Sequence, residues 1–227
     1  MEHIVRSFDE ELKTLLDLTA RLGDVALAHI DAALRALAAA GKKTTPGPLD
    51  PGELYMAAEN QVVRILALRA PMAEDLRFVV SALKIATSLR QTIDHADGIL
   101  ERANRLNISQ ARHSLRWIRR LGDEVRAMQK DVMAAFQVRD AQAAMAIWHR
   151  DQFIDEQHSG LFRELLTYMM EDAKNITACS EMIFISKDIE RIGDLATNIA
   201  EMIHYLVRGA PVSERRIKSD TAALTMG

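Results

Sequence analysis

The sequence predicts an all-α protein, and three observations lead to this prediction. Aromatic residues make up only 5% of the 227 residues, while alanine, leucine, methionine, arginine and glutamate, which favour helices, are abundant. Apolar residues recur at steps of three and four along most of the chain, which is the period of an amphipathic helix. Because the chain has only ten glycines and five prolines, turns are few and the helices must be long.

The first half of the chain predicts three helices. The first runs from about residue 2 to 40 and ends in a segment rich in proline and glycine, 41–51. The second covers about 52–69 and stops before Pro71, since a proline disfavours the helical conformation of the residue before it. The third covers about 72–105.

The second half predicts three more helices of similar length. Ser109 is a candidate N-cap for a fourth helix, about 110–138. A short turn then leads to a fifth helix, about 141–171, and a second turn leads to a sixth, about 176–208. Gly209 is expected to close the sixth helix.

Three helices, a break and three helices predict a duplication, and repeated stretches support it. Leu22-Gly23-Asp24 recurs as Leu121-Gly122-Asp123, and 88–96 lies about 100 residues before the similar 188–196. Each half is long enough to bury its own core, so we expect two tandem, pseudo-symmetric three-helix bundles. The expected units are a first bundle over 1–107, a second bundle over 108–210 and a mobile tail over 211–227.

Charge and cysteine content exclude several classes of protein. A net charge of −3 provides no basic field for nucleic acid. A single cysteine, Cys179, excludes a disulfide framework and a cysteine-based zinc site, and it is expected to be a reduced core thiol, as in a cytoplasmic protein. No run of 18 apolar residues occurs, and the N-terminus lacks a signal peptide pattern. We therefore expect a cytoplasmic protein that reaches the membrane only peripherally.

A row of polar residues on the sixth predicted helix is the first hint of function. Glu190, Asp194, Asn198 and Glu201 fall at i, i+4, i+8 and i+11, which places them on one face beside the apolar stripe. Acidic residues four apart repel unless a counter-charge or a cation lies between them. One interpretation is that Glu190 and Asp194 pair with neighbours such as Lys187 and Arg191; the other is that they bind a cation.

The fifth predicted helix carries a matching row, Asp151 and Asp155, at i and i+4. The short turn between the fifth and sixth helices predicts antiparallel neighbours, which brings Asp155 level with Glu190. Asp151, Asp155, Glu190 and Asp194 would then line one groove, where hard oxygen ligands suit a divalent or trivalent cation. His158 and His204 are expected to be partly exposed rather than ligands.

Four motifs, in order, resemble the PhoU family of phosphate-transport regulatory proteins. Glu190-Arg191-Ile192-Gly193-Asp194, followed by Asn198-Ile199-Ala200-Glu201, resembles the family signature. The stretch Ala70-Pro71-Met72-Ala73-Glu74-Asp75-Leu76-Arg77 is similar to a second family motif. Phe8 to Leu15 resembles the N-terminal helix, and 167–172 resembles the fifth. The resemblance extends from about Phe8 to Gly209.

The resemblance implies two three-helix bundles, often assembled as a homodimer. It also implies a cytoplasmic negative regulator of the phosphate-starvation (Pho) response. Such proteins are thought to couple the phosphate transporter's ATPase subunit, PstB, to the sensor histidine kinase, PhoR. Some members bind iron or zinc clusters through Glu/Asp-x-x-x-Asp pairs, one cluster in each bundle.

Carried over residue by residue, the resemblance distinguishes the two halves. The second bundle keeps the metal pattern at Asp151, Asp155, Glu190 and Asp194, with Asn198 as a further candidate ligand and iron, zinc, magnesium or manganese as candidate metals. The first bundle keeps only Glu59 and Asp94, because Arg90 stands where Glu190 has its counterpart. Tyr55 and Gly98 replace the counterparts of Asp151 and Asn198. We expect the first bundle to bind metal poorly or not at all.

The expected function is that of an adaptor that acts by binding partners. No Gly-rich phosphate loop and no Ser/His/Asp or Cys/His set is present, so an enzyme is not expected. The main alternative is a metal-binding helical-bundle protein that stores metal or catalyses a metal-dependent reaction, and another is a purely structural protein. An enzyme needs an open coordination position, whereas an adaptor needs an exposed face of interface size.

Overall fold

The computed structural model describes residues 2–39, 45, 50–106 and 112–213. Within these ranges the chain is helical apart from short connections, and no strand occurs there, which confirms the predicted all-α fold. The elements are α1 (Glu2–Ala39), α2 (Pro51–Arg69), α3 (Ala73–Arg105), α4 (Arg112–Val138), α5 (Ala141–Trp148), α6 (Asp151–Glu171), a 3-10 turn (Ala173–Asn175) and α7 (Ile176–Arg208). Ser109, the predicted boundary at 107/108 and most of the predicted tail lie outside the described residues.

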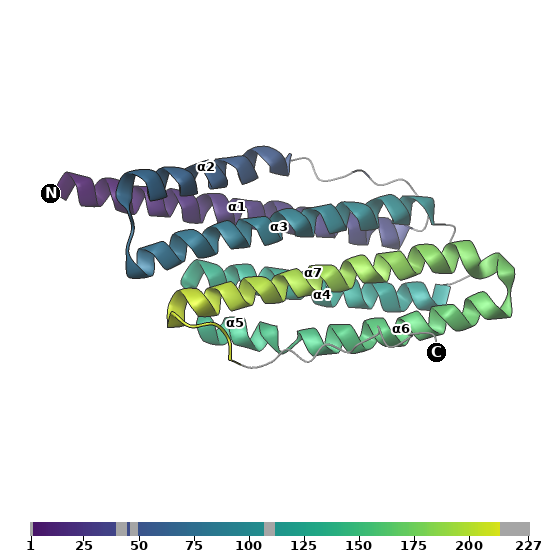
Figure 1. Cartoon of the computed structure of the whole chain (residues 1–227). Coiled ribbons are helices and arrows are strands. Elements are labelled where there is room, and N and C mark those ends of the chain that lie inside the picture. Colours follow the sequence, from purple (N-terminus) through teal and green to yellow (C-terminus); the bar gives the residue numbers. More distant parts are fainter. Residues whose placement is uncertain (1, 40–44, 46–49, 107–111, 214–227) are drawn as a thin grey trace, which may run out of the picture.

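The helices run side by side along the long axis of the molecule (Figure 1). In the first half, α3 packs against α1 and α2, and in the second half α7 packs against α4, α5 and α6. The two halves meet mainly where α3 and α7 lie along each other, and a second contact joins α1 to α4. Buried apolar side chains from both halves form one continuous core. No described helix combines the length and the hydropathy needed to cross a membrane.

The repeated Leu-Gly-Asp motif is explained by the contact between α1 and α4. A Cβ on Gly122 of α4 would lie 2.4 Å from the Cδ2 of Leu34 in α1. A Cβ on Gly23 of α1 would lie 2.6 Å from the Cε of Met133 in α4. Because both distances are shorter than van der Waals contact, each glycine lets a side chain of the opposite helix approach its backbone.

The structure corrects the predicted fifth helix, 141–171, which is broken into α5 and α6. At the break, the backbone N–H of Arg150 donates to the carbonyl oxygen of Ile147 at 3.0 Å, three residues back instead of four. This tightens the chain into a turn. The guanidinium of Arg150, which precedes α6, forms an ion pair with Asp131 of α4 at 2.8 Å. As a result, α6 begins at Asp151.

Local signals define other helix ends, at Asp140, where the sequence predicts a turn, and at Gly209, where it predicts the end of a helix. The carboxylate of Asp140 accepts the backbone N–H groups of Gln142 and Ala143 at 2.9 Å and caps α5. Gly209 closes α7 with φ of 73°, and its N–H donates to the carbonyl oxygen of Tyr205 at 2.8 Å. Cys179 is buried, as predicted, and burial raises the pKa of its thiol.

Candidate functional site

Three carboxylates from two neighbouring helices come together in the second half. Asp151 and Asp155 lie one turn apart on α6, and Asp194 lies on the antiparallel α7. One carboxylate oxygen of each residue lies within 4.8 Å of the other two. The three residues are only 2%, 6% and 6% exposed. Three of the four acids expected in the groove are therefore adjacent, and we call them the acidic cluster.

The surroundings of the acidic cluster orient two of its carboxylates. The hydroxyl of Thr197 donates to Asp151 across the helix pair at 3.2 Å and to the carbonyl oxygen of Gly193 at 3.0 Å. The guanidinium of Arg191 lies 3.5 Å from Asp194, one turn earlier on α7. Thr197 was not expected at the site, although it lies three residues after Asp194 and so shares its helical face.

The electrostatics of the acidic cluster suit a cation. Removing a carboxylate from water is costly, and three carboxylates this close repel one another in their charged forms. An ion such as Mg²⁺ or Mn²⁺ prefers carboxylate oxygens and would offset this repulsion. The donor set therefore fits a hard cation held between α6 and α7.

Glu190, the fourth expected ligand, does not belong to the acidic cluster. Its carboxylate lies 2.7 Å from the ammonium group of Lys187, one turn earlier on α7. The ion-pair interpretation therefore describes Glu190, because a neighbouring lysine draws its carboxylate away from the three aspartates.

His158 departs from its expected exposure. The imidazole is only 7% exposed, not partly exposed as expected. Burial lowers the pKa of His158, Glu190 opposes that effect, and Lys187 adds to it. The structure thus places the imidazole of His158 in the interior. His204 is half-buried, as expected, with its Nδ1 at 3.2 Å from the carbonyl oxygen of Ala210.

The counterpart residues of the first half do not gather. Arg90 forms an ion pair with Asp94 along α3, and Asp94 is exposed. Glu59 accepts a hydrogen bond from the hydroxyl of Tyr55 at 2.9 Å along α2. Among the described residues, no group like the acidic cluster forms around Glu59 and Asp94. Tyr55 and Arg90, which stand at two of the degenerate positions, each interact with the acid that remains on their own helix.

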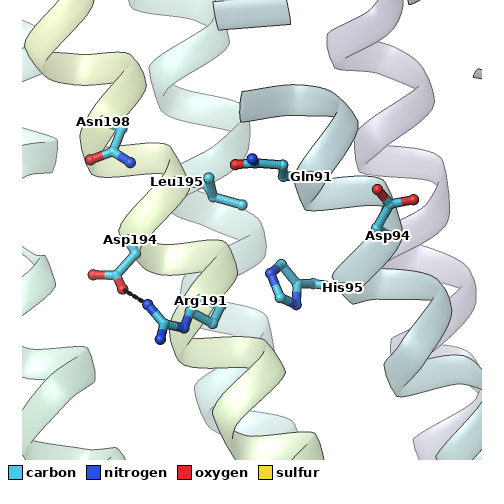
Figure 2. A pocket seen from close by; sticks show the side chains of 7 residues that line it. All are labelled: Gln91, Asp94, His95, Arg191, Asp194, Leu195 and Asn198. Carbon is cyan, nitrogen blue, oxygen red and sulfur yellow. Dashed lines mark hydrogen bonds and ion pairs between the residues drawn. The ribbon is translucent and has the colours of Figure 1, made fainter. Parts of the chain in front are cut away.

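A polar cavity of about 460 Å³ lies between α3 and α7 (Figure 2). Its lining residues are Gln91, Asp94 and His95 of α3 and Arg191, Asp194, Leu195 and Asn198 of α7. In Figure 2, Arg191 extends toward Asp194, which both lines the cavity and belongs to the acidic cluster. The cavity therefore offers a route from solvent to the acidic cluster. Asn198, the further candidate ligand, is exposed and lines this cavity.

Comparisons with known proteins agree with the fold and the motifs. The family model described as PhoU domain matches residues 52–103 and 118–203. A phosphate-specific transport system accessory protein PhoU homolog from Caulobacter vibrioides is 40% identical over 224 residues, which are 96% of this chain and 97% of that protein. A homolog of the same name from Xylella fastidiosa is 36% identical and covers 97% of this chain and 95% of its own.

Solved structures show the same architecture. PhoU from Pseudomonas aeruginosa superposes with a TM-score of 0.71 at 30% identity, over 91% of this chain and 98% of that one. The phosphate transport system regulatory protein PhoU from Streptococcus pneumoniae superposes with a TM-score of 0.80 at 28% identity, over 91% of this chain and all of that one. The helices, the motifs and these matches lead to one conclusion: the chain belongs to the PhoU family.

Proposed function

We propose that this protein is an accessory and regulatory component of a phosphate-specific transport system, and that it acts in the cytoplasm by binding other proteins. The observation that carries the proposal is the 40% identity to the Caulobacter vibrioides protein of that description, which extends over nearly the whole of both chains. Relatives named as accessory proteins favour regulation over turnover.

The partners that we propose are the transporter's ATPase subunit, PstB, and the sensor histidine kinase, PhoR. As an adaptor between them, the protein would restrain phosphate uptake and the response to phosphate starvation. An adaptor needs an apolar surface that is not used by its own core. Exposed apolar side chains lie along α2 and at its corner with α3, namely those of Met56, Val63, Leu66, Leu68, Met72 and Leu76. This surface supports the proposal.

The acidic cluster would hold one metal ion per chain in the second half. Asp151, Asp155 and Asp194 would be its ligands, and iron, zinc, magnesium and manganese are the candidates. Bound there, the ion would supply positive charge and link α6 to α7. Metal storage or metal-dependent catalysis is the less favoured alternative, because relatives of this length and identity are named as accessory proteins.

A binding assay tests the adaptor function and the role of the acidic cluster together. The purified chain is used to capture PstB and the cytoplasmic part of PhoR, with and without Mg²⁺, Mn²⁺, Zn²⁺ or Fe³⁺. The test variant carries Asp151→Asn, Asp155→Asn and Asp194→Asn, and the matched control carries Glu190→Gln on the same helix pair. We expect capture by the wild type and the control and weaker capture by the test variant.

Each outcome has a distinct meaning. Capture that is indifferent to metal and to the three substitutions would keep the adaptor and make the acidic cluster purely structural. No capture of either partner under any condition would contradict the adaptor proposal. The resemblance also predicts a homodimer, and sedimentation of the purified chain would measure it.

A further inference from the structure

A surface groove on the second half lies between α4 and α6, apart from the acidic cluster. It encloses about 290 Å³, and its walls include Trp117 and Leu121 of α4 and Glu156, Gly160 and Glu164 of α6. A smaller hollow continues from it and reaches Phe153. None of these residues belongs to the acidic cluster or to the cavity of Figure 2.

The α6 wall of the groove combines an open position with two acidic side chains. No atom of another part of the molecule lies within 4 Å of the place where a Cβ of Gly160 would stand. Glu156 lies four residues before Gly160 and Glu164 four residues after it, so all three share one helical face. The two carboxylates are separated by eight residues, roughly 12 Å along the helix. Each carboxylate accepts one hydrogen bond from an uncharged group, Glu164 from the hydroxyl of Ser114 and Glu156 from the amide of Gln152, both at 3.0 Å. A cationic side chain that entered the gap would pair with their remaining oxygens.

The opposite wall and the floor of the groove are apolar. Trp117 is 40% exposed, and the chain's own Arg120, which lines the smaller hollow with Glu124, makes a cation–π contact with its ring at 5.7 Å. Phe153 is 43% exposed at the far end, while Leu121 and Leu161 are buried in the floor. The groove can therefore contact an apolar side chain next to a cationic one.

The first half carries an arginine at the corresponding position of its sequence. The spacing that relates Glu59 to Asp155 places Arg64 of α2 at the position of Gly160. The Nε of Arg64 lies 3.9 Å from the carboxylate of Glu11 in α1. Gln61 of α2 donates to the carbonyl oxygen of Glu11 at 3.0 Å. Side chains of α2 thus bridge to α1, whereas in the second half glycine leaves the equivalent place open.

We propose that the groove between α4 and α6 binds an arginine or lysine side chain of a partner polypeptide, with an apolar neighbour of that side chain packed near Phe153. Glu156 and Glu164 supply the charge complementarity, and Gly160 supplies the space. The inference does not depend on PstB or PhoR, since the chemistry of the groove defines only the type of segment that fits it.

Two peptides that differ in charge alone provide the first test. The probe is a short fluorescein-labelled helical peptide of alanine and leucine with one central arginine. In the control peptide, citrulline, which is uncharged and similar in shape, replaces this arginine. Binding to the full chain is followed by fluorescence anisotropy. We expect the arginine peptide to bind about tenfold more tightly than the citrulline peptide, because its contacts are charge-assisted.

Variants of the groove provide the second test. Gly160→Arg should weaken binding of the arginine peptide about tenfold, because it places the chain's own guanidinium between the two acids. The matched control, Met170→Arg, should leave affinity nearly unchanged, since it adds the same charge to α6 at an exposed position outside the groove. Glu156→Gln combined with Glu164→Gln should remove the difference between the two peptides. Circular dichroism verifies folding, and if Gly160→Arg were misfolded, the glutamine variant would decide.

Three results would overturn the inference. The first is equal binding of the arginine and citrulline peptides to the wild type, including no binding of either at millimolar concentration. The second is binding that Gly160→Arg and the glutamine variant leave unchanged. The third is peptide binding that splits a dimer of this chain, which would assign the groove to a basic residue of a second copy rather than to a different partner.

Discussion

The first half of the molecule, α1–α3, and the second half, α4–α7, share a helical plan but differ in how they treat their acidic residues. In the first half, Asp94 is exposed and pairs with Arg90. In the second half, Asp194 is buried beside Asp151 and Asp155. Apolar positions and close-packed glycines are kept in both halves, and those positions build the fold. The charged positions have diverged, and they make one half a candidate binding site.

Metal titration gives the largest expected difference between the halves. We expect one Mn²⁺ site per chain by calorimetry. Asp194→Asn should weaken it by about 100-fold, or roughly 2.7 kcal/mol, because it removes one of three charged ligands. Asp94→Asn, the equivalent change in the first half, should alter affinity by less than about twofold, since surface acids contribute little. Two equal sites per chain would contradict the comparison.

The paired glycines of α1 and α4 give the next largest effect. Gly122→Ala should lower the free energy of unfolding by about 1–3 kcal/mol, because the new methyl group overlaps Leu34. Gly23→Ala should cost less, since the side chain that it meets, Met133, is unbranched and more flexible than leucine and can move aside. Urea denaturation of both variants measures the difference. Equal losses in the free energy of unfolding would contradict the prediction, because they would mean that Leu34 and Met133 adjust equally well.

Burial of His158 predicts a pH dependence specific to the second half. Its pKa is lowered on folding, so the unfolded chain binds the proton more readily and stability is lost as pH falls through the unfolded pKa of about 6.5. The contribution cannot exceed about 1.4 kcal/mol per pH unit for one proton. Replacing His158→Gln should flatten the stability profile between about pH 5 and 7. Denaturant melts of the wild type and the variant across that range measure the slope, and an unchanged slope in the variant would contradict the prediction.

The smallest effect is expected for the two ion pairs within helices, Arg90 with Asp94 and Lys187 with Glu190. Arg90→Ala in the first half should change the free energy of unfolding by about 0.5 kcal/mol or less, because Asp94 remains in contact with water. Lys187→Ala in the second half should cost more, about 1 kcal/mol, since Glu190 is largely buried and loses a close cation. Thermal melts of the two variants compare these costs. A larger loss of stability for Arg90→Ala than for Lys187→Ala would contradict the prediction.

Local sequence patterns predicted most of the fold for physical reasons. Helix periodicity and the end signals at Pro71 and Gly209 act within a few residues, and the observed bounds of α1, α2, α3 and α7 lie within a residue or two of the expected ones. The break between α5 and α6 was missed. His149 and Arg150 carry no proline or glycine signal, and the turn is supported by a side chain that reaches α4.

The candidate site shows the same division between local and tertiary information. Spacing placed Asp151, Asp155 and Asp194 on facing stripes, because helical geometry and a short connection determine which residues come level. The departure of Glu190, the contribution of Thr197 and the burial of His158 depend on side-chain rotamers and on neighbours from other helices. A one-dimensional pattern does not contain that information.

The sequence by itself determined an all-α chain, the acidic pattern of its second half and its membership of the PhoU family, since these depend on residue types at fixed spacings. Only the tertiary structure decided which acids meet, how α1 and α4 approach through Gly23 and Gly122, and where Gly160 leaves a groove open. Those features arise from packing between helices, where differences of an ångström determine whether two groups are in contact.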